Sequence, residues 1–177
     1  MISFSHLIKY FKRVETPRYL DMKIQEIALD LFNLKDMGKL RDTYDAQRYL
    51  DNISDEIRAE YAFEKFIGIE FDFEKRKVKN YKRLEYQFSD KALQLIPITS
   101  KKIYPIKKIE DSIIIYLKPE KVAYIGGLIK KSQLKKYISS SSSIFGELNL
   151  DLNKLDLNKV KYFENIEELI KVLNSKL

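Results

Sequence analysis

The sequence predicts an α/β fold in which a mixed β-sheet is flanked by helices and preceded by an N-terminal helical extension. Apolar residues recur at helical spacing in the first third of the chain and again near its end. After Gly68 the apolar period changes from 3.6 to 2, and several strand-like segments follow in succession. The 177 residues are 45% hydrophobic and 33% charged, which is the balance of a globular domain with a real core. We expect the extension to cover residues 1–52 and the α/β core to cover residues 53–177.

The composition excludes several kinds of site. The chain has no cysteine, so neither a disulfide scaffold nor a thiolate metal site is available. His6 is the only histidine, which argues against a zinc site and against a Ser-His-Asp triad. A bound metal would therefore be a hard ion such as Mg²⁺ or Mn²⁺, held by carboxylates.

The charge balance favours a polyanionic partner. The formal net charge is +7 and the isoelectric point is about 9.3, which is typical of proteins that contact nucleic acid. No apolar run reaches the roughly 20 residues that span a bilayer, and the charged N-terminus lacks the pattern of a secretory signal. We therefore expect a cytoplasmic, intracellular protein with no membrane partner. Residues 1–13 are predicted to form a short helix on the body of the protein, with an amphipathic membrane-surface helix as the alternative.

The predicted extension contains one clear helix. Pro17 is suited to a helix start, because its missing N–H would have no partner in the first turn. The helix is expected to end at Gly38, and residues 40–50 are predicted to form a short helix or an ordered loop. The expected buried stripe contains Leu20, Ile24, Ile27, Ala28, Leu31 and Leu34.

A second helix is predicted from an N-cap at Ser54 to a stop at Gly68. Its acidic residues Glu56, Glu60 and Glu64 are four positions apart and share one face. That face is either a solvated acidic surface or the source of a side chain that points into a site.

The next segment alternates apolar and acidic residues, so residues 69–74 are predicted to form a half-exposed strand. The basic run 75–83 that follows is either a solvated loop or a loop that contacts phosphates, with Tyr81 available for stacking on bases.

Residues 84–98 are predicted to form a β-hairpin with Asp90 and Lys91 at the centre of its turn. The expected pairs are Phe88 with Leu93, Gln87 with Gln94, Tyr86 with Leu95, and Glu85 with Ile96. In this register Glu85, Gln87, Gln94 and Ile96 share one face, and the other face belongs to the core.

The remaining segments complete the expected sheet and its helices. Strands are predicted at residues 103–106, 112–117 and 122–125, and the glycine pair after the last one indicates tight packing or a bend. A short basic helix is expected at 132–138, a polar strand or turn within 146–160, and an amphipathic helix at 166–173.

Three segments resemble the PD-(D/E)XK superfamily of restriction-endonuclease-like nucleases, and together they cover about residues 54–138. RAEYAFEKFIGIEFD is similar to the first core helix of that family, LEYQFSDKALQLIPI to its motif hairpin, and DSIIIYLKPEKVAYIGGLIKKSQL to its later strand pair and short helix. The resemblance implies a restriction-endonuclease-like sheet and an origin in a phage, a mobile element or a defence system.

In that family two carboxylates bind Mg²⁺ or Mn²⁺, and a lysine orients the attacking water. The resemblance places Glu85 at the first acid, Gln94 at the second and Ile96 at the lysine, with Glu60 on the helix. An amide and an alkyl group cannot do this chemistry, so the motif is degenerate. If activity survives, the expected catalytic set is Glu60, Glu85, Gln94 and Lys101, and the expected metal ligands are Glu60, Glu85 and Asp90.

The sequence therefore favours a nucleic-acid-binding protein with a nuclease-like core. One alternative is an active Mg²⁺- or Mn²⁺-dependent nuclease, and another is a non-catalytic interaction or assembly subunit with a protein partner or a second copy of the chain. The residues expected to contact nucleic acid are Lys75, Arg76, Lys77, Lys79, Lys82, Arg83, Lys130, Lys131, Lys135 and Lys136.

Overall fold

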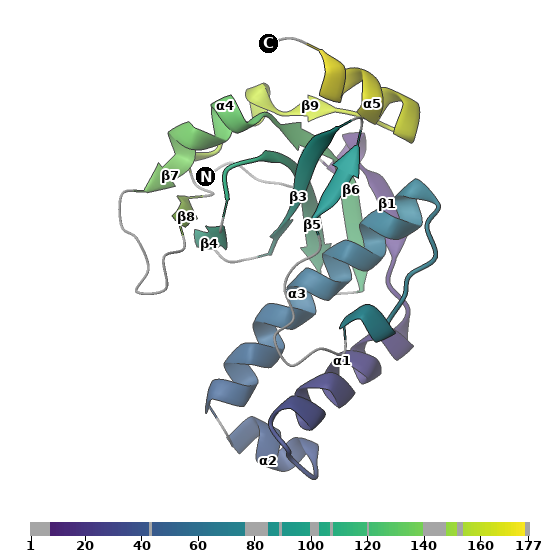
Figure 1. Cartoon of the computed structure of the whole chain (residues 1–177), viewed down its shortest axis with the longest axis vertical. Helices are drawn as coiled ribbons and strands as arrows, with labels where there is room; N and C mark the ends of the chain where they lie inside the picture. The colour runs from purple at the N-terminus through teal and green to yellow at the C-terminus, as the bar shows by residue number, and fades with distance from the viewer. Residues whose placement is uncertain are drawn as a thin grey trace.

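In the computed structural model of the chain, a large mixed β-sheet lies at the centre of an α/β fold and a helical arm extends from it (Figure 1). The structure describes residues 8–42, 44–76, 85–88, 90–99, 103–106, 108–119, 121–139, 148–151 and 154–175. The fold class predicted from the sequence is confirmed at this level.

The large sheet has the strand order β1-β6-β5-β3-β2, and β9 also pairs with β6. Its strands are β1 (Lys12–Glu15), β2 (Tyr86–Phe88), β3 (Lys91–Ile98), β5 (Asp111–Lys118), β6 (Val122–Ile129) and β9 (Lys161–Tyr162). β3 and β5 run parallel, while the other neighbours are antiparallel. β5 is covered on both faces, which explains its almost continuous apolar sequence.

A second, smaller sheet covers part of one face of the large sheet. It contains β4 (Ile103–Ile106), β8 (Leu148–Asp151) and β7 (Ile138–Ser139) in the order β4-β8-β7. β7 follows a short helical segment made of α4 (Lys131–Leu134) and η4 (Lys135–Tyr137). The core on this face includes Ile96, Ile98, Ile114, Leu134 and Leu150.

Two helices cover the opposite face of the large sheet, namely α3 (Tyr44–Ile67) and α5 (Ile166–Asn174). The predicted C-terminal helix is confirmed as α5, and the Asn165 side chain caps it by accepting a hydrogen bond from the Glu168 backbone N–H at 2.9 Å. Leu169 and Leu173 of α5 lie in the same core as Phe63 of α3.

The arm consists of α1 (Arg18–Leu31), α2 (Met37–Asp42) and the first part of α3 (Figure 1). It has its own apolar core, which includes Leu20, Ile24 and Ile57. The start of α1 after Pro17 is confirmed, but the helix start predicted at Ser54 is wrong. Because Ala46, Ile53 and Ile57 continue one buried stripe, α3 runs through Ser54, and the expected boundary between residues 52 and 53 falls inside a continuous helix.

Three other local predictions are wrong. α1 ends at Leu31, and Gly38 lies inside α2. In the described part of the expected N-terminal helix, from residue 8 onward, the chain forms η2 (Ile8–Tyr10) and β1 instead, while residues 1–7, which include His6, lie outside the described residues. Residues 69–74 form no strand: after Gly68 (φ 75°) the chain is irregular as far as η3 (Glu74–Arg76), and Phe71 and Phe73 pack against the arm.

The predicted hairpin is confirmed as β2 and β3, but its register differs by two residues. Tyr86 pairs with Leu93, Gln87 with Ala92, and Phe88 with Lys91. Asp90 lies in the turn with φ 62°, a conformation that Asp tolerates better than most residues. A two-residue shift leaves each side chain on its predicted face, so Tyr86 and Leu93 face α3 while Ile96 faces the smaller sheet.

The glycine pair of β6 lies where another segment approaches closely, as the sequence predicts. The pairing of β5 with β6 shifts register between Ile114 and Ile115, so Gly126 forms a bulge. A Cβ atom at Gly126 would lie 3.0 Å from the Cα atom of Phe11, and one at Gly127 would lie 2.7 Å from Cγ1 of Val160. Within the described residues, no helix is long and apolar enough to cross a membrane.

Candidate functional site

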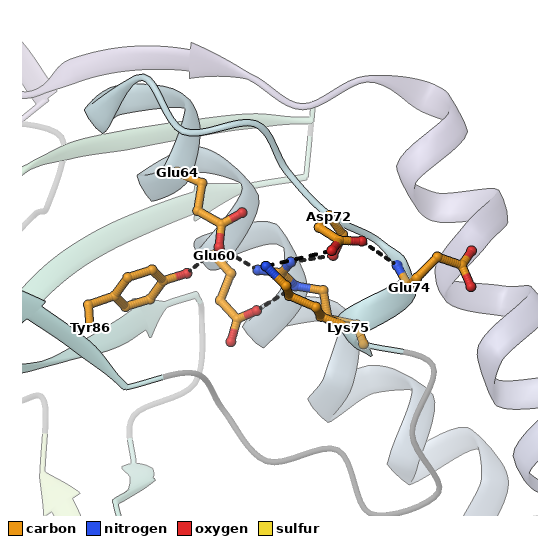
Figure 2. Close-up of polar contacts among 7 residues, drawn as sticks. Glu60, Glu64, Asp72, Glu74, Lys75 and Tyr86 are labelled. Carbon is orange, nitrogen blue, oxygen red and sulfur yellow. Dashed lines mark hydrogen bonds and ion pairs between the residues drawn. The ribbon is translucent and has the colours of Figure 1, made fainter.

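The acidic face of α3 is buried around an arginine from η3, and Figure 2 shows the polar contacts of this region. Arg76 donates a hydrogen bond from Nε to Oε2 of Glu60 at 2.9 Å and from Nη2 to Oε1 of Glu64 at 2.7 Å. Its Nη1 atom donates to the backbone carbonyl of Asp72 at 2.5 Å. We call Glu60, Glu64, Arg76 and Tyr86 the Arg76 cluster.

Local structure brings these side chains together. Glu60 and Glu64 are one helical turn apart, so they point in the same direction from α3. The Asp72 carboxylate accepts a hydrogen bond from the Glu74 backbone N–H at 3.0 Å at the start of η3 (Figure 2). The Arg76 side chain that follows in η3 is fully buried. The Arg76 guanidinium also lies 4.0 Å from the ring centre of Phe71, which shields it from water.

Tyr86 connects the Arg76 cluster to the large sheet. Its hydroxyl donates a hydrogen bond to Oε1 of Glu64 at 3.0 Å, and its ring lies edge-on to Phe63 at 4.8 Å. Burial raises the pKa of Tyr86 well above its ordinary value, and the negative charges of Glu60 and Glu64 raise it further. Burial alone would lower the pKa of Arg76, but the same two carboxylates outweigh that effect and raise it.

The Arg76 cluster holds two carboxylates and one guanidinium. Glu64 Oε2 is buried and has no hydrogen-bond partner among the described residues, whereas Glu64 Oε1 accepts from both Arg76 and Tyr86. A divalent cation between Glu60 and Glu64 would face the fixed positive charge of Arg76. The arrangement is therefore that of an internal ion network that joins α3, η3 and β2.

The hairpin residues predicted to be catalytic have different environments. Glu85 is on the surface, where its Oε1 accepts a hydrogen bond from Lys108 at 2.5 Å and both side chains are 57% exposed. Gln94 is buried, and its amide donates to the Ser112 hydroxyl at 2.9 Å. Ile96 is 1% exposed and belongs to the core beneath the smaller sheet.

The structure does not bring the expected metal ligands together. Glu60 is fully buried on the α3 side of the sheet, whereas Glu85 and Asp90 are exposed. Among the residues that the structure describes, no group of three or more His, Asp or Glu side chains is arranged to hold a metal ion. Lys101 lies outside the described residues.

Two residues predicted to contact nucleic acid are internal, which corrects the sequence prediction. Arg76 is fully buried in its cluster. Lys130 is buried at the end of β6, where its Nζ atom donates to Asp111 Oδ2 at 3.2 Å and to the Leu173 carbonyl at 2.6 Å. Lys91 donates to the same carbonyl at 2.5 Å, so two lysines stabilise the negative C-terminal end of α5.

Four other predicted residues lie on the surface. Lys75 is exposed and lies 3.6 Å from an Asp72 carboxylate oxygen. Lys131, Lys135 and Lys136 are all exposed on the solvent side of α4 and η4, and we call them the α4–η4 lysines. Lys77, Lys79, Lys82 and Arg83 lie outside the described residues.

The buried charged side chains of the described residues balance one another. They are the acids Glu60 and Glu64 and the bases Arg76 and Lys130. Their formal charges cancel, so the burial of these four side chains does not offset the formal net charge of +7 that the whole sequence carries. A positive net charge of this kind attracts polyanions.

No protein-family model, curated protein or solved structure matches this chain. The resemblance to the PD-(D/E)XK nucleases therefore stays a prediction, and the functional argument depends on the geometry of the fold and its side chains.

Proposed function

We propose that this protein binds nucleic acid without cleaving it, through a positively charged surface on a fold that resembles a nuclease core. The observation that carries the proposal is the exposure of the α4–η4 lysines, on a chain whose formal net charge is +7. Lysines in this arrangement bind phosphates as point charges and are insensitive to base sequence.

The environments of the hairpin residues support the absence of cleavage. At the position that corresponds to the second acid of the nuclease motif, the Gln94 amide donates a hydrogen bond to the Ser112 hydroxyl. That hydroxyl in turn donates to the Glu110 carbonyl at 2.8 Å. At the position of the lysine, Ile96 is packed in the core and has no polar atom in its side chain. Glu60 is held by Arg76 at 2.9 Å, so it is already neutralised by an internal cation.

The binding half of the proposal is tested by the salt dependence of affinity. Fluorescence anisotropy with labelled single-stranded and duplex oligonucleotides, between 50 and 300 mM salt, is expected to show binding that weakens as salt rises. The logarithm of the affinity should fall by about 0.7 to 0.9 per phosphate contact for each tenfold rise in salt. The triple variant Lys131→Ala, Lys135→Ala, Lys136→Ala should reduce this slope by about 2.

A matched triple variant away from α4 and η4 controls for net charge. Lys35 and Lys65 are exposed and Lys23 is partly exposed in an ion pair with Glu26, and replacing all three lysines by alanine removes the same charge. We expect this control to retain most of the slope. If both triple variants reduced the salt slope equally, the α4–η4 lysines would not be the contact surface. If the unmodified protein showed no salt-sensitive binding, the proposal would be overturned.

The catalytic half is tested by incubating the protein with the same oligonucleotides in the presence of Mg²⁺ or Mn²⁺. The expected result is intact substrate. Cleavage that depends on the metal and disappears in Glu85→Ala would refute the proposal that the protein does not cleave nucleic acid. It would show that the protein is an active metal-dependent nuclease.

A further inference from the structure

A group of tyrosines lies beside exposed cations on the face of the large sheet that also carries the smaller sheet. We call it the tyrosine surface, and its rings are those of Tyr10, Tyr116, Tyr124 and Tyr162. They come from η2, from the consecutive strands β5 and β6, and from β9 near the end of the chain. β1 and β9 both lie along the outer edge of β6 (Figure 1).

Strand register places these residues on one face. Tyr124 of β6 pairs with Tyr116 of β5 on one side and with Arg13 of β1 on the other, and paired residues of antiparallel strands share a face. Tyr162 of β9 pairs with Gly127, farther along β6 on the same face. The ring centres of Tyr116 and Tyr124 are 6.4 Å apart, and those of Tyr10 and Tyr162 are 5.2 Å apart.

The rings pack against the core on one side and keep part of their surface exposed to solvent. Tyr116, Tyr124 and Tyr162 are half-buried against the core of that face, and Tyr10 is 49% exposed. The glycine pair of β6 lets Phe11 lie directly against the strand, and the Phe11 ring supports Tyr162 at 6.0 Å. Rings that are ordered in advance lose little entropy when a flat ligand stacks on them.

Cations border the rings. Lys9 Nζ lies 4.7 Å from the ring centre of Tyr10, and Lys118 Nζ lies 5.5 Å from that of Tyr124. Arg13 adds a third positive charge, which Glu15 partly offsets through an ion pair of 2.8 Å. The four side chains leave a net charge of two positive units beside the exposed aromatic rings.

We propose that this surface binds single-stranded nucleic acid, with unpaired bases stacked on the tyrosines and phosphates beside Lys9, Arg13 and Lys118. Only a single strand offers both flat base faces and closely spaced negative charges, since the bases of a duplex are stacked on one another. Ring faces and lysines do not distinguish DNA from RNA, so both are ligands here. The proposal rests on the proposed function and adds to it a second contact surface and a preference for unpaired bases.

The first experiment compares the affinities of tyrosine variants for single-stranded and duplex oligonucleotides, measured by anisotropy with labelled dA20, rA20 and a 20-base-pair duplex. The double variant Tyr10→Leu, Tyr124→Leu removes one ring from each pair but keeps an apolar side chain. It is expected to bind both single strands about fivefold more weakly, at the lower end of what a stacked base contributes. Its affinity for the duplex should stay within twofold of the unmodified value.

Two controls separate loss of stacking from loss of fold. Tyr10→Phe, Tyr124→Phe keeps both rings and should restore single-strand affinity, while Tyr44→Leu removes an exposed ring from the arm and should change nothing. Thermal unfolding establishes that each variant is folded. If the double leucine variant bound single strands as tightly as the unmodified protein and with the same salt sensitivity, the proposed role of the tyrosine surface would be overturned and the proposed function would stand. If the unmodified protein did not bind nucleic acid, both proposals would be overturned.

A second experiment uses the unmodified protein, so it does not depend on the folding of a variant. Oligonucleotides that carry 5-iodouracil are bound, irradiated and digested, and the crosslinked peptides are identified by mass spectrometry. Crosslinks are expected at Tyr10, Tyr116, Tyr124 or Tyr162. Crosslinks confined to tyrosines elsewhere, such as Tyr19 or Tyr44, would overturn the proposal.

Discussion

Replacing Arg76 by methionine should destabilise the protein more than any change to a surface ion pair. Methionine has a similar length but no charge, so it fills the space of the arginine and leaves Glu60 and Glu64 buried without a cation. The hydrogen bonds that would be lost are 2.9 Å and 2.7 Å long and join fully buried groups. The change therefore tests whether the Arg76 cluster is the ion network that joins α3, η3 and β2.

The size of the effect follows from the burial of the partners. Removing one member of a buried ion pair costs about 3–5 kcal/mol, because the remaining charge stays uncompensated. For a chain of this size that loss lowers the melting temperature by about 6–20 °C. With a urea dependence of about 2 kcal/mol per molar, the unfolding midpoint should fall by about 2 M.

The assay is urea unfolding at pH 5 and pH 8, followed by circular dichroism. We expect a smaller loss at pH 5, because protonation of the unpaired carboxyls removes the charge that is costly to bury. The triple variant Glu60→Gln, Glu64→Gln, Arg76→Met removes both signs of charge and should recover much of the stability. Lys108→Met breaks an exposed pair of similar length and should leave the midpoint unchanged.

Two results would refute this reasoning. Exposed ion pairs contribute less than about 1 kcal/mol. If Arg76→Met lowered the free energy of unfolding at pH 8 by no more than this, Arg76 would not lie in a water-free ion network. A loss that is larger at pH 5 than at pH 8 would contradict the sign expected for unpaired buried carboxylates.

Three further predictions concern other contacts. Tyr86→Phe should lower the free energy of unfolding by about 1.5–3 kcal/mol at pH 8, which is the contribution of a hydrogen bond to the charged Glu64. Burial and the nearby carboxylates raise the pKa of Tyr86, so the unmodified protein loses stability above about pH 10, where this tyrosine ionises in the unfolded chain. The difference in urea midpoint between the unmodified protein and the variant should therefore be smaller at pH 11 than at pH 8. Burial would raise the pKa of Asp21, but hydrogen bonds from Lys121 and Arg58 outweigh it and lower that pKa below 3.8. Asp21→Asn should therefore cost about 1 kcal/mol at pH 7, and acid titration of the urea midpoint should show this cost shrinking as the pH falls below 3.8. Gly127→Ala should cost about 1–3 kcal/mol in thermal unfolding because the new Cβ would lie 2.7 Å from Val160, and adding Val160→Ala should recover part of it.

Several elements were predictable because local patterns determine them. The alternation of the hairpin and the helical stripe of α5 each have a period that indicates one kind of element, and the apolar run of β5 has the short length and the β-branched residues of a buried strand. The hairpin register was not predictable in this way, because a shift of two residues leaves every side chain on the same face. Tertiary contacts favour the observed register, in which Lys91 pairs with Phe88 and reaches the Leu173 carbonyl at the end of α5.

The candidate site was predictable only in part. The faces of Gln94 and Ile96 follow from the alternation of β3, and the structure shows both side chains on the expected face. The burial of Arg76 does not follow from its neighbours, since a basic run is usually a solvated loop. Phe71 and Phe73 were the available signal, because two aromatics just before the run indicate a segment that packs against the protein rather than a strand with one exposed face.

By itself the sequence determined the fold class, the positions of most strands and helices, the absence of thiol chemistry and the net positive charge, all of which depend on composition or on short-range periodicity. Only the tertiary structure decided which charges are internal and which meet solvent. Burial of an ionised side chain is stable only when an opposite charge arrives from elsewhere in the chain, as η3 supplies Arg76 to α3 and β5 supplies Asp111 to Lys130. The long-range pairing of β9 with β6 likewise brings Tyr162 onto the face that holds Tyr116 and Tyr124, which no local pattern specifies.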